Sequence, residues 1–519
     1  MKKTIKHPIQ QRIGLILMLL AMVFPFSTRA IDWPESNSII GGVYYAVTNV
    51  PDRDPSEVGD PEDPRLSISK LIVGPDVTRI GSYTFVGSVL TQIDLSYASS
   101  LETIGEGAFS GAYLMTKVTL CENSPLTTIG NAAFKGCKKL ANFNYENAIN
   151  LETIGNEAFA SCAFTKLDLS NSKLVRIGDS AFYNNTGLLT VVLPPTVTTM
   201  GKSAFEACTS LANINLGDLT NLGAIEEYTF YSNNLGTITI PASVTTIGQS
   251  AFSTSWIKHL YFAENSSLKT IGPYAFRKIG TTSVVLPASV ESIGYRAFDE
   301  SEIASIKLEE GSKLTSLDKG VFYACKYLKT AELAAEITEI PDELFMNCWA
   351  LRTFEIPSTV TSIGNRAFDH CTALESINLP TGLKTIGLEA FRNCNKCTSV
   401  NIPSGVTTIG KQAFYECRGL LSAKVPESVT DMGEGVFRCC MNLASVECEV
   451  SDIPAHTFNM VDTCDSYMGS KLKSVTLKNT QTIGEGAFCT CNVLPKLELP
   501  STVKTIGAKA FYKCKNCLS

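Results

Sequence analysis

The chain has 519 residues, of which 44% are hydrophobic and 18% are charged, and its formal net charge at pH 7 is −6. By length alone it has room for three ordinary domains. The acidic balance argues against a nucleic-acid partner, which requires a basic stripe.

The first 30 residues differ in kind from the rest. Basic residues at positions 2, 3, 6 and 12 precede an apolar run of 14 residues at 13–26, and Thr28 and Ala30 supply small residues for cleavage. This pattern predicts a secretory signal peptide over residues 1–30. The alternative, a membrane anchor, fits less well because a spanning helix needs about 20 apolar residues. No second run of that length occurs, so no transmembrane segment is expected.

Residues 31–76 are predicted to form an N-terminal cap. They hold an apolar segment at 39–47, an acidic proline-rich loop at 51–64 and a second apolar segment at 71–73. We expect a hairpin-like cap over the first of the repeats that follow, because a stack of repeats otherwise exposes its core. The acidic loop suits calcium or simple solvation, and without the D-x-D-x-D-G spacing we favour solvation. Its acidic residues are Asp52, Asp54, Glu57, Asp60, Glu62 and Asp63.

From residue 77 onward, one pattern recurs. Its clearest copy is residues 374–394, LESINLPTGLKTIGLEAFRNC. Ile377 and Leu379 alternate with polar residues, as in a short strand with one buried face. Pro380 ends this strand, a second extended piece follows at 383–386, and Gly387 lets the backbone turn. Residues 388–393 are predicted to form one helical turn.

The copies are counted through the phenylalanine that follows the Ile-Gly pair. One unit cannot bury its apolar residues alone, so the units must stack. The sequence thus predicts an α/β solenoid over residues 77–519, with about 19 coils of about 23 residues, each with short strands and one helical turn. The marker phenylalanines are Phe85, Phe109, Phe134, Phe159, Phe182, Phe205, Phe230, Phe252, Phe276, Phe298, Phe322, Phe345, Phe368, Phe391, Phe414, Phe437, Phe458, Phe488 and Phe511.

In each coil, the residue between the two buried strand positions is expected to point outward. These residues form a row, mostly polar, from Asp94 to Glu498 along one face. Solenoids bind ligands through such extended faces, so we expect recognition here; an ordinary solvated face is the alternative. The predicted binding face is Val192, Asn215, Thr239, Tyr261, Val285, Lys307, Glu332 and Glu355.

A second candidate lies where the spacing widens to 30 residues, between Phe458 and Phe488. The insertion at 460–471 is predicted to be a binding loop, with Asp462, Asp465 and Tyr467 as its candidate residues. The alternative is a tolerated variation in length. Near the C-terminus no further strand follows Phe511, so we expect the last coil to be closed by residue 518 or covered by a partner.

The 18 cysteines would ordinarily suggest disulfides in an exported chain. Eleven of them, however, follow a marker phenylalanine by three residues, and Cys397, Cys448 and Cys517 take other core positions. We therefore expect small buried hydrophobes, and no zinc or redox role for the C-x-x-C pairs at 394–397 and 514–517. Oxidation between adjacent coils stays open, because their Cα atoms would lie about 5 Å apart. The cysteines expected to be more reactive are Cys121, Cys439, Cys464 and Cys489.

The sequence has no pattern typical of an enzyme. Its histidines, at 7, 259, 370 and 456, are not in H-E-x-x-H spacing, and neither G-x-S-x-G nor a P-loop occurs. A catalytic site needs different residues converging on one place, whereas this chain repeats the same residues along a line. We expect neither catalysis nor a cofactor.

Units written L-x-x-I-x-L-P-x-x-V-T-x-I-G-x-x-A-F-x-x-C, as at 351–371 and 374–394, resemble the BspA-like leucine-rich repeats of bacterial surface proteins. Such proteins are common in Bacteroides and its relatives. The resemblance covers residues 77–519 and implies a secreted or surface-displayed bacterial protein that acts in adhesion, in host or cell–cell interaction. Its implied partners are proteins, host extracellular matrix among them, or glycans. The alternative function is a structural part of a cell-envelope complex that docks through its last coil.

Overall fold

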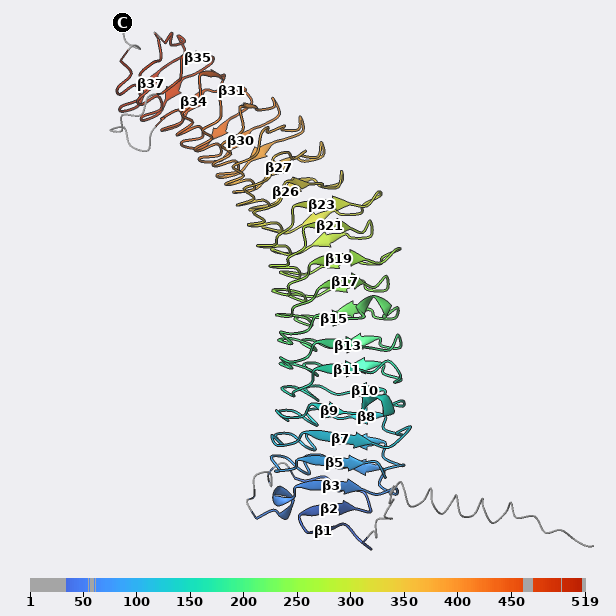
Figure 1. The fold of residues 1–519 in the computed structure, drawn as a ribbon. Helices are drawn as coiled ribbons and strands as arrows, with labels where there is room; N and C mark the ends of the chain where they lie inside the picture. Colours follow the sequence, from blue (N-terminus) through green and yellow to red (C-terminus); the bar gives the residue numbers. More distant parts are fainter. Residues whose placement is uncertain are drawn as a thin grey trace, which may run out of the picture.

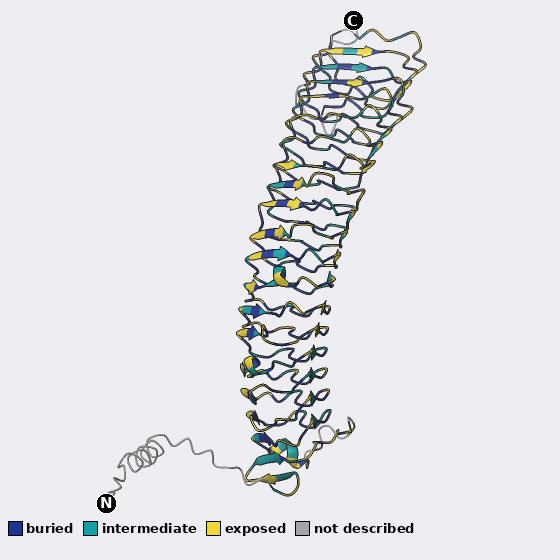
Figure 2. Cartoon of the chain, turned by 90° about the vertical axis from the view of Figure 1, so that its right-hand side faces the viewer, coloured by how far each residue is buried: buried dark blue, intermediate teal, exposed yellow. Residues whose placement is uncertain are grey.

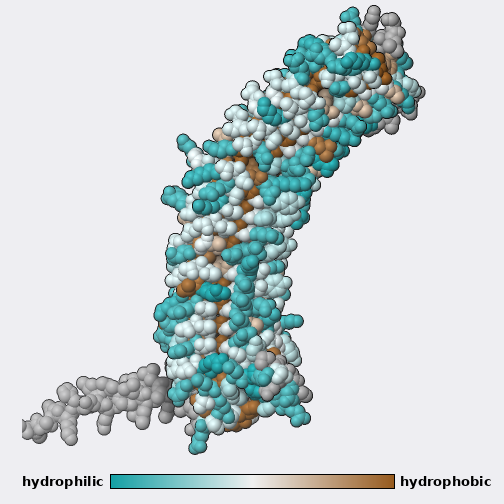
Figure 3. All heavy atoms as spheres, turned by 180° about the vertical axis from the view of Figure 1, so that it is seen from behind, coloured by the Kyte–Doolittle hydropathy of each residue, from teal (hydrophilic) through white to brown (hydrophobic). Residues whose placement is uncertain are grey.

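The computed structural model describes residues 34–54, 56, 60, 62–460, 470–495 and 497–515. These residues form one long column of stacked coils (Figure 1). The column runs straight from β1 to about β21 and curves in its C-terminal part, as the view at right angles also shows (Figure 2). Seen from behind, the surface is mostly hydrophilic with a narrow hydrophobic seam along the column (Figure 3).

Each coil contributes to three sides of the column. A strand of up to four residues forms the strand face, a two-residue strand forms the second face, and a run of tight turns closes the coil. Nineteen second-face strands each precede one marker phenylalanine, so the predicted solenoid with coils of about 23 residues is confirmed.

The strands of the strand face are β3 (Lys70–Val73), β5 (Gln92–Leu95), β7 (Lys117–Leu120), β9 (Asn142–Phe143), β11 (Lys166–Asp168), β13 (Thr190–Val192), β15 (Asn213–Ile214), β17 (Thr237–Ile240), β19 (His259–Phe262), β21 (Ser283–Leu286), β23 (Ser305–Leu308), β25 (Thr330–Ala331), β29 (Ser399–Asn401), β31 (Ser422–Val425), β33 (Ser445–Cys448) and β35 (Ser474–Leu477). Those of the second face are β4 (Arg79–Ile80), β6 (Thr103–Ile104), β8 (Thr128–Ile129), β10 (Thr153–Ile154), β12 (Arg176–Ile177), β14 (Thr199–Met200), β16 (Ala224–Ile225), β18 (Thr246–Ile247), β20 (Thr270–Ile271), β22 (Ser292–Ile293), β24 (Ser316–Leu317), β26 (Glu339–Ile340), β27 (Ser362–Ile363), β28 (Thr385–Ile386), β30 (Thr408–Ile409), β32 (Asp431–Met432), β34 (Asp452–Ile453), β36 (Thr482–Ile483) and β37 (Thr505–Ile506). Short 3₁₀ helices with described bounds are η2 (Pro64–Ser67), η3 (Tyr145–Asn147) and η4 (Leu216–Asp218).

Neighbouring coils pair in parallel and in register, so equivalent residues lie side by side. Ile386 of β28, for example, pairs with Ile363 of β27 and Ile409 of β30. Inside the column, the nineteen marker phenylalanines form one continuous stack with ring centroids 5.1–5.8 Å apart. Each buried phenylalanine contributes about 1.5–3 kcal/mol by leaving water.

The predicted helical turn is wrong, and with it the α/β class, because the described residues form no α-helix. In the unit 374–394, Glu389 and Asn393 adopt φ of 52° and 59°, which a right-handed helix does not contain. Their amides donate to the next coil, to the carbonyls of Lys411 (3.0 Å) and Tyr415 (2.9 Å). In an α-helix these amides would donate to carbonyls of the same helix, whereas here they donate to the neighbouring coil. The column is therefore a β-solenoid.

Gly387 serves close packing between coils, and not the turn that the sequence suggests. Its φ lies outside the left-handed region, and a Cβ added there would lie 2.6 Å from the carbonyl carbon of Gly364 and 2.7 Å from the amide nitrogen of Asn365. Neighbouring coils therefore approach too closely at this corner for a side chain.

At the N-terminal end, a hairpin precedes the regular coils. β1 (Ser38–Ile40) pairs antiparallel with β2 (Val43–Ala46), and β2 pairs parallel with β3. Arg53 and Asp63, which follow the hairpin in the chain, form a buried ion pair at 2.9 Å. The hairpin thus extends the strand-face sheet by two strands.

The described carboxylates of the acidic loop do not converge on one point. Asp52 accepts from the guanidinium of Arg79 (2.6 Å), Asp54 accepts from Ser56, and Asp63 faces Arg53. Among the described residues, no group of three His, Cys, Asp or Glu side chains is arranged to hold a metal ion. Glu57 lies outside the described residues.

Candidate binding face

The row of outward residues on the strand face has the register that the sequence predicts. Thr239 lies opposite Tyr261, and Val285 opposite Lys307, in directly paired strands. The residues on either side of each point inward, as in β21, where Val284 and Leu286 are buried while Val285 is exposed. The row is therefore a real surface feature.

Toward its two ends, the row is engaged in ion pairs. Glu447 contacts the ammonium groups of Lys424 (3.3 Å) and Lys478 (2.7 Å), and hydrogen bonds from Lys478 and Lys424 lower the pKa of Glu447. At the other end, Asp94 pairs with Lys70 at 3.1 Å. A ligand at these places would compete with existing partners.

Asn215, a member of the predicted binding face, has a structural contact. Its Oδ1 accepts from the amide of Leu193 (2.9 Å) and its Nδ2 donates to the Leu193 carbonyl (3.0 Å). The side chain thus replaces ladder hydrogen bonds where β15 ends and η4 begins. Asn144 bonds the backbone of Leu120 in the same way before η3.

The middle of the row is different. Tyr261 and Val285 are 54% and 47% exposed and lie in neighbouring coils on the same face. Within the described chain, no ion pair or side-chain hydrogen bond involves Lys307, Glu332 or Glu355. These five residues, the central face, combine open apolar surface with uncommitted charges.

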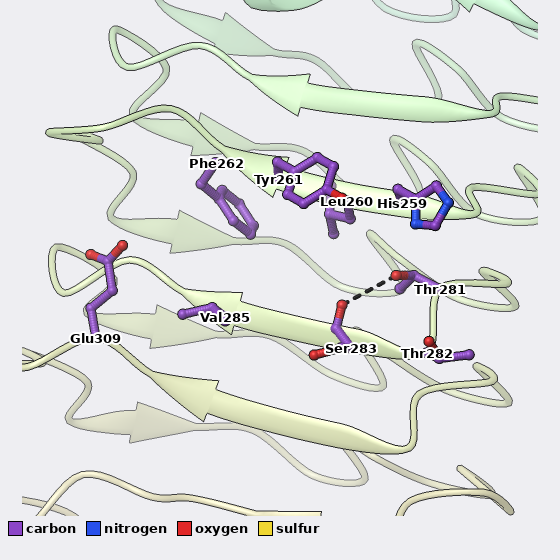
Figure 4. A pocket seen from close by; sticks show the side chains of 9 residues that line it. All are labelled: His259, Leu260, Tyr261, Phe262, Thr281, Thr282, Ser283, Val285 and Glu309. Carbon is purple, nitrogen blue, oxygen red and sulfur yellow. Dashed lines mark hydrogen bonds between the residues drawn. The ribbon is translucent and has the colours of Figure 1, made fainter.

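A hollow of about 230 Å³ lies on the central face between Tyr261 and Val285 (Figure 4). It forms because the strand-face sheet is interrupted there: β17 and β19 make one sheet, and β21, β23 and β25 make the next. Without ladder hydrogen bonds, β19 and β21 leave room between them. The hollow is lined by His259, Leu260, Tyr261, Phe262, Thr281, Thr282, Ser283, Val285 and Glu309.

Sequence reasoning missed two aromatic residues beside this hollow. His259 begins β19, and its ring stacks near Tyr261 with centroids 6.4 Å apart. Trp256 is 48% exposed and lies against Gly280, whose Cβ would sit 3.4 Å from the indole. The sequence did contain a signal for Trp256, because the chain has only three tryptophans and this one departs from the repeat pattern.

The predicted binding loop cannot be placed. Asp462, Asp465 and Tyr467 lie outside the described residues. Val192 and Thr239, also predicted for the binding face, are half-buried and lie N-terminal to the central face.

The eleven cysteines that follow a marker phenylalanine, the ladder cysteines, share one contact. Each thiol donates to the carbonyl of the marker phenylalanine in the preceding coil, at 2.9–3.6 Å. Where a coil has Ser301 or Asn233 at this position, that side chain donates the same bond. The expected role as small hydrophobes is therefore incomplete, because the position also uses a buried donor.

Burial raises the pKa of the Cys137 and Cys208 thiols to about 12, so both stay protonated at neutral pH. The C-x-x-C pair at 394–397 points to two different acceptors. Cys394 donates to the Phe368 carbonyl and Cys397 to that of Ser399. Cys489, predicted to be among the more reactive, is disulfide-bonded.

The sequence matches the family described as BspA type leucine rich repeat region in six copies, over residues 65–174, 152–267, 262–375, 338–464 and 463–519. The comparison with curated proteins gave no match. Among solved structures, a leucine-rich repeat protein from Bacteroides ovatus is 22% identical, with a TM-score of 0.49, and the match covers 82% of this chain and 95% of that one.

A leucine rich cell surface protein from Faecalibacterium prausnitzii is 20% identical, with a TM-score of 0.30, over 89% of this chain and 90% of that one. The pneumococcal vaccine antigen PcpA is 16% identical, with a TM-score of 0.34, over 92% and 94%. The repeat matches extend over most of the sequence. This chain therefore belongs to the BspA type leucine-rich repeat family.

Proposed function

We propose that this protein is a surface-displayed binding module, and that its ligand is another protein seated on the central face. The observation that carries the proposal is the pair Tyr261 and Val285, exposed on either side of a hollow where the sheet is interrupted. Interfaces concentrate their energy in a few aromatic and aliphatic anchors surrounded by polar residues. Lys307 and Glu332 supply such a polar surround.

The charges beside the hollow favour specificity. Lys307 is cationic, Glu332 and Glu355 are anionic, and all three are exposed. Because these side chains form no ion pair within the described chain, a ligand with complementary charges could pair with them without breaking an existing contact. An extended repeating scaffold supports a binding role over a catalytic one.

The test is binding of the full chain to a panel of matrix proteins and mucins, next to the variant Tyr261→Ala/Val285→Asp. We expect saturable binding that the variant weakens by about tenfold or more, the loss for one anchor residue. Thr476→Ala, at the equivalent position in β35, is the matched control and should bind like the parent chain. Circular dichroism verifies that each variant is folded.

Two results would contradict the proposal. If the panel includes a ligand whose affinity is equal for parent and variant, recognition lies elsewhere on the molecule. If no protein on the panel binds, the central face is an ordinary solvated surface for those partners.

Export belongs to the proposal, through the signal peptide expected at residues 1–30. Those residues lie outside the described part of the chain. Among the described residues, none of the helices has the length and apolar character needed to cross a bilayer. Amino-terminal sequencing of the protein recovered from the native cell surface tests this point, since a start near residue 31 is expected.

A further inference from the structure

A second hollow, of about 350 Å³, lies on the turn face, the side formed by the tight turns. One coil carries Ser250 and Ser253 there, and the preceding coil carries Tyr228 and Tyr231 at the equivalent places. The following coil carries Tyr274. Two small side chains between large aromatic ones leave a slot one coil wide.

The width of the slot suits a puckered ring. The phenylalanine rings of the three coils are 5.3 and 5.4 Å apart, so the outer two coils are separated by about 11 Å. A flat ring in contact with two aromatic walls needs about 7–8 Å between them, at 3.5–4.0 Å per contact. A pyranose ring with its substituents is thicker, and its C–H face packs against tyrosine as other apolar surfaces do.

Two buried polar atoms of the next coil, beyond Tyr274, belong to residues that line the same hollow and lack a partner in the described chain. Asp299 is 2% exposed, and while its Oδ2 accepts from Nε of Arg277 at 3.0 Å, its Oδ1 has no donor. Nε of Arg296, also at the hollow, has no acceptor. Buried groups in this state are rare and cost free energy. Of two adjacent hydroxyl groups on a ligand, one would donate to Oδ1 of Asp299 and the other would accept from Nε of Arg296.

The surrounding charges are already neutralised. Arg277 pairs with Glu300 at 2.8 Å, and Arg296 pairs with Glu343 at 3.1 Å. The Arg296 guanidinium also lies 4.0 Å from the centroid of the Tyr323 ring. An ionic ligand would have to displace these contacts, whereas a neutral polyhydroxyl ligand would not.

We propose that the turn-face hollow binds a neutral glycan, with one saccharide unit between Tyr228 and Tyr274 and the hydroxyl groups of the adjoining unit hydrogen-bonded to Asp299 and Arg296 in the coil beyond Tyr274. This site lies on a different side of the column from the central face and does not depend on its function. It gives the protein a second ligand class.

The test applies the full chain to an array of neutral and acidic oligosaccharides and measures the affinity of the best neutral one by calorimetry. Tyr274→Ala should weaken that affinity by about tenfold or more, the value of one stacking ring. Tyr83→Ala removes a tyrosine at the equivalent position of a distant coil and should leave affinity unchanged.

A second pair of variants guards against misfolding. Tyr231→Ala removes the second tyrosine that the Tyr228 coil contributes to the hollow, and Tyr183→Ala removes the equivalent tyrosine two coils earlier. The proposal is overturned if no neutral oligosaccharide on the array binds, if only acidic ones bind, or if the wall variants and their controls bind equally. Tyr261→Ala on the strand face should not affect the saccharide.

Discussion

The ladder cysteines lead to a prediction that separates hydrogen bonding from packing. Cys371 is fully buried, and its thiol donates to the carbonyl of Phe345 at 3.2 Å. That carbonyl also accepts from the amide of Cys348 at 3.0 Å, so a substitution at Cys371 removes one of two donors. Ser301 shows that a hydroxyl performs the same task in another coil, donating at 2.8 Å.

The expected magnitudes follow from these contacts. Cys371→Ala loses a sulfur atom from a closed core, about 1 kcal/mol, and a hydrogen bond, about 0.5–1 kcal/mol. Cys371→Ser loses similar volume but keeps the donor. We therefore expect the alanine variant to be less stable than the serine variant by about 1 kcal/mol.

Urea unfolding followed by circular dichroism measures the difference, with equal slopes for the two variants as a condition for comparing midpoints. Ala112 occupies the equivalent position in an early coil. Ala112→Ser should therefore stabilise the chain or leave it unchanged. If Cys371→Ala is as stable as Cys371→Ser, the thiol acts as a hydrophobe only, and the hydrogen-bond argument fails.

Three further predictions concern stability. Burial raises the pKa of the Cys137 and Cys208 thiols to about 12, above the unfolded value of about 8.5. The stability that these protonated thiols contribute is therefore fully present below pH 8.5 and is lost as pH rises toward 12. Urea unfolding midpoints measured at pH 8, 9 and 10 should fall, and should fall less in the Cys137→Ser/Cys208→Ser variant. Gly387→Ala should cost about 1–3 kcal/mol in the unfolding free energy through the clash between coils, whereas Gly223→Ala, with open space around its Cβ, should be neutral or slightly stabilising; equal thermal midpoints would contradict this account. Asn215→Ala removes two hydrogen bonds to the Leu193 backbone and should cost about 1–2 kcal/mol by urea unfolding, and an unchanged midpoint would show that the amide is dispensable.

Much of the fold could be predicted because the same buried positions recur in every copy of the repeat. The alternation around Ile377 and the regular recurrence of phenylalanine fix which side chains face inward, and stacking follows from the inability of one coil to bury them. The row of outward residues follows from the same alternation, as the pairing of Thr239 with Tyr261 shows.

The closing turns could not be predicted in the same way. The spacing of Ala390, Phe391 and Cys394 suits a helix face, but a spacing does not say where the amides donate. In the column, the amide of Phe391 donates to Ala413 of the next coil at 2.8 Å. Contacts between coils therefore override a local helical preference, and only the stacked structure contains them.

The candidate site was predictable in outline but not in detail. The exposed positions of Tyr261 and Val285 follow from the alternation. The hollow between them does not, because it depends on a missing ladder between β19 and β21. For Asn215, the outward position could be predicted from the alternation, but the side-chain hydrogen bonds to the Leu193 backbone could not.

Departures from the repeat determine where this molecule offers a ligand something distinctive. A coil that follows the pattern presents the same surface as its neighbours, whereas the broken ladder at β19 and the serines at 250 and 253 interrupt that uniformity. Tyr261 and Tyr274 belong to the same coil but lie at hollows on different faces. Deleting that coil should abolish both proposed activities, whereas Tyr261→Ala should impair protein binding alone and Tyr274→Ala saccharide binding alone. If either substitution impairs both, the two hollows form one coupled site, and the division into two ligand classes is wrong.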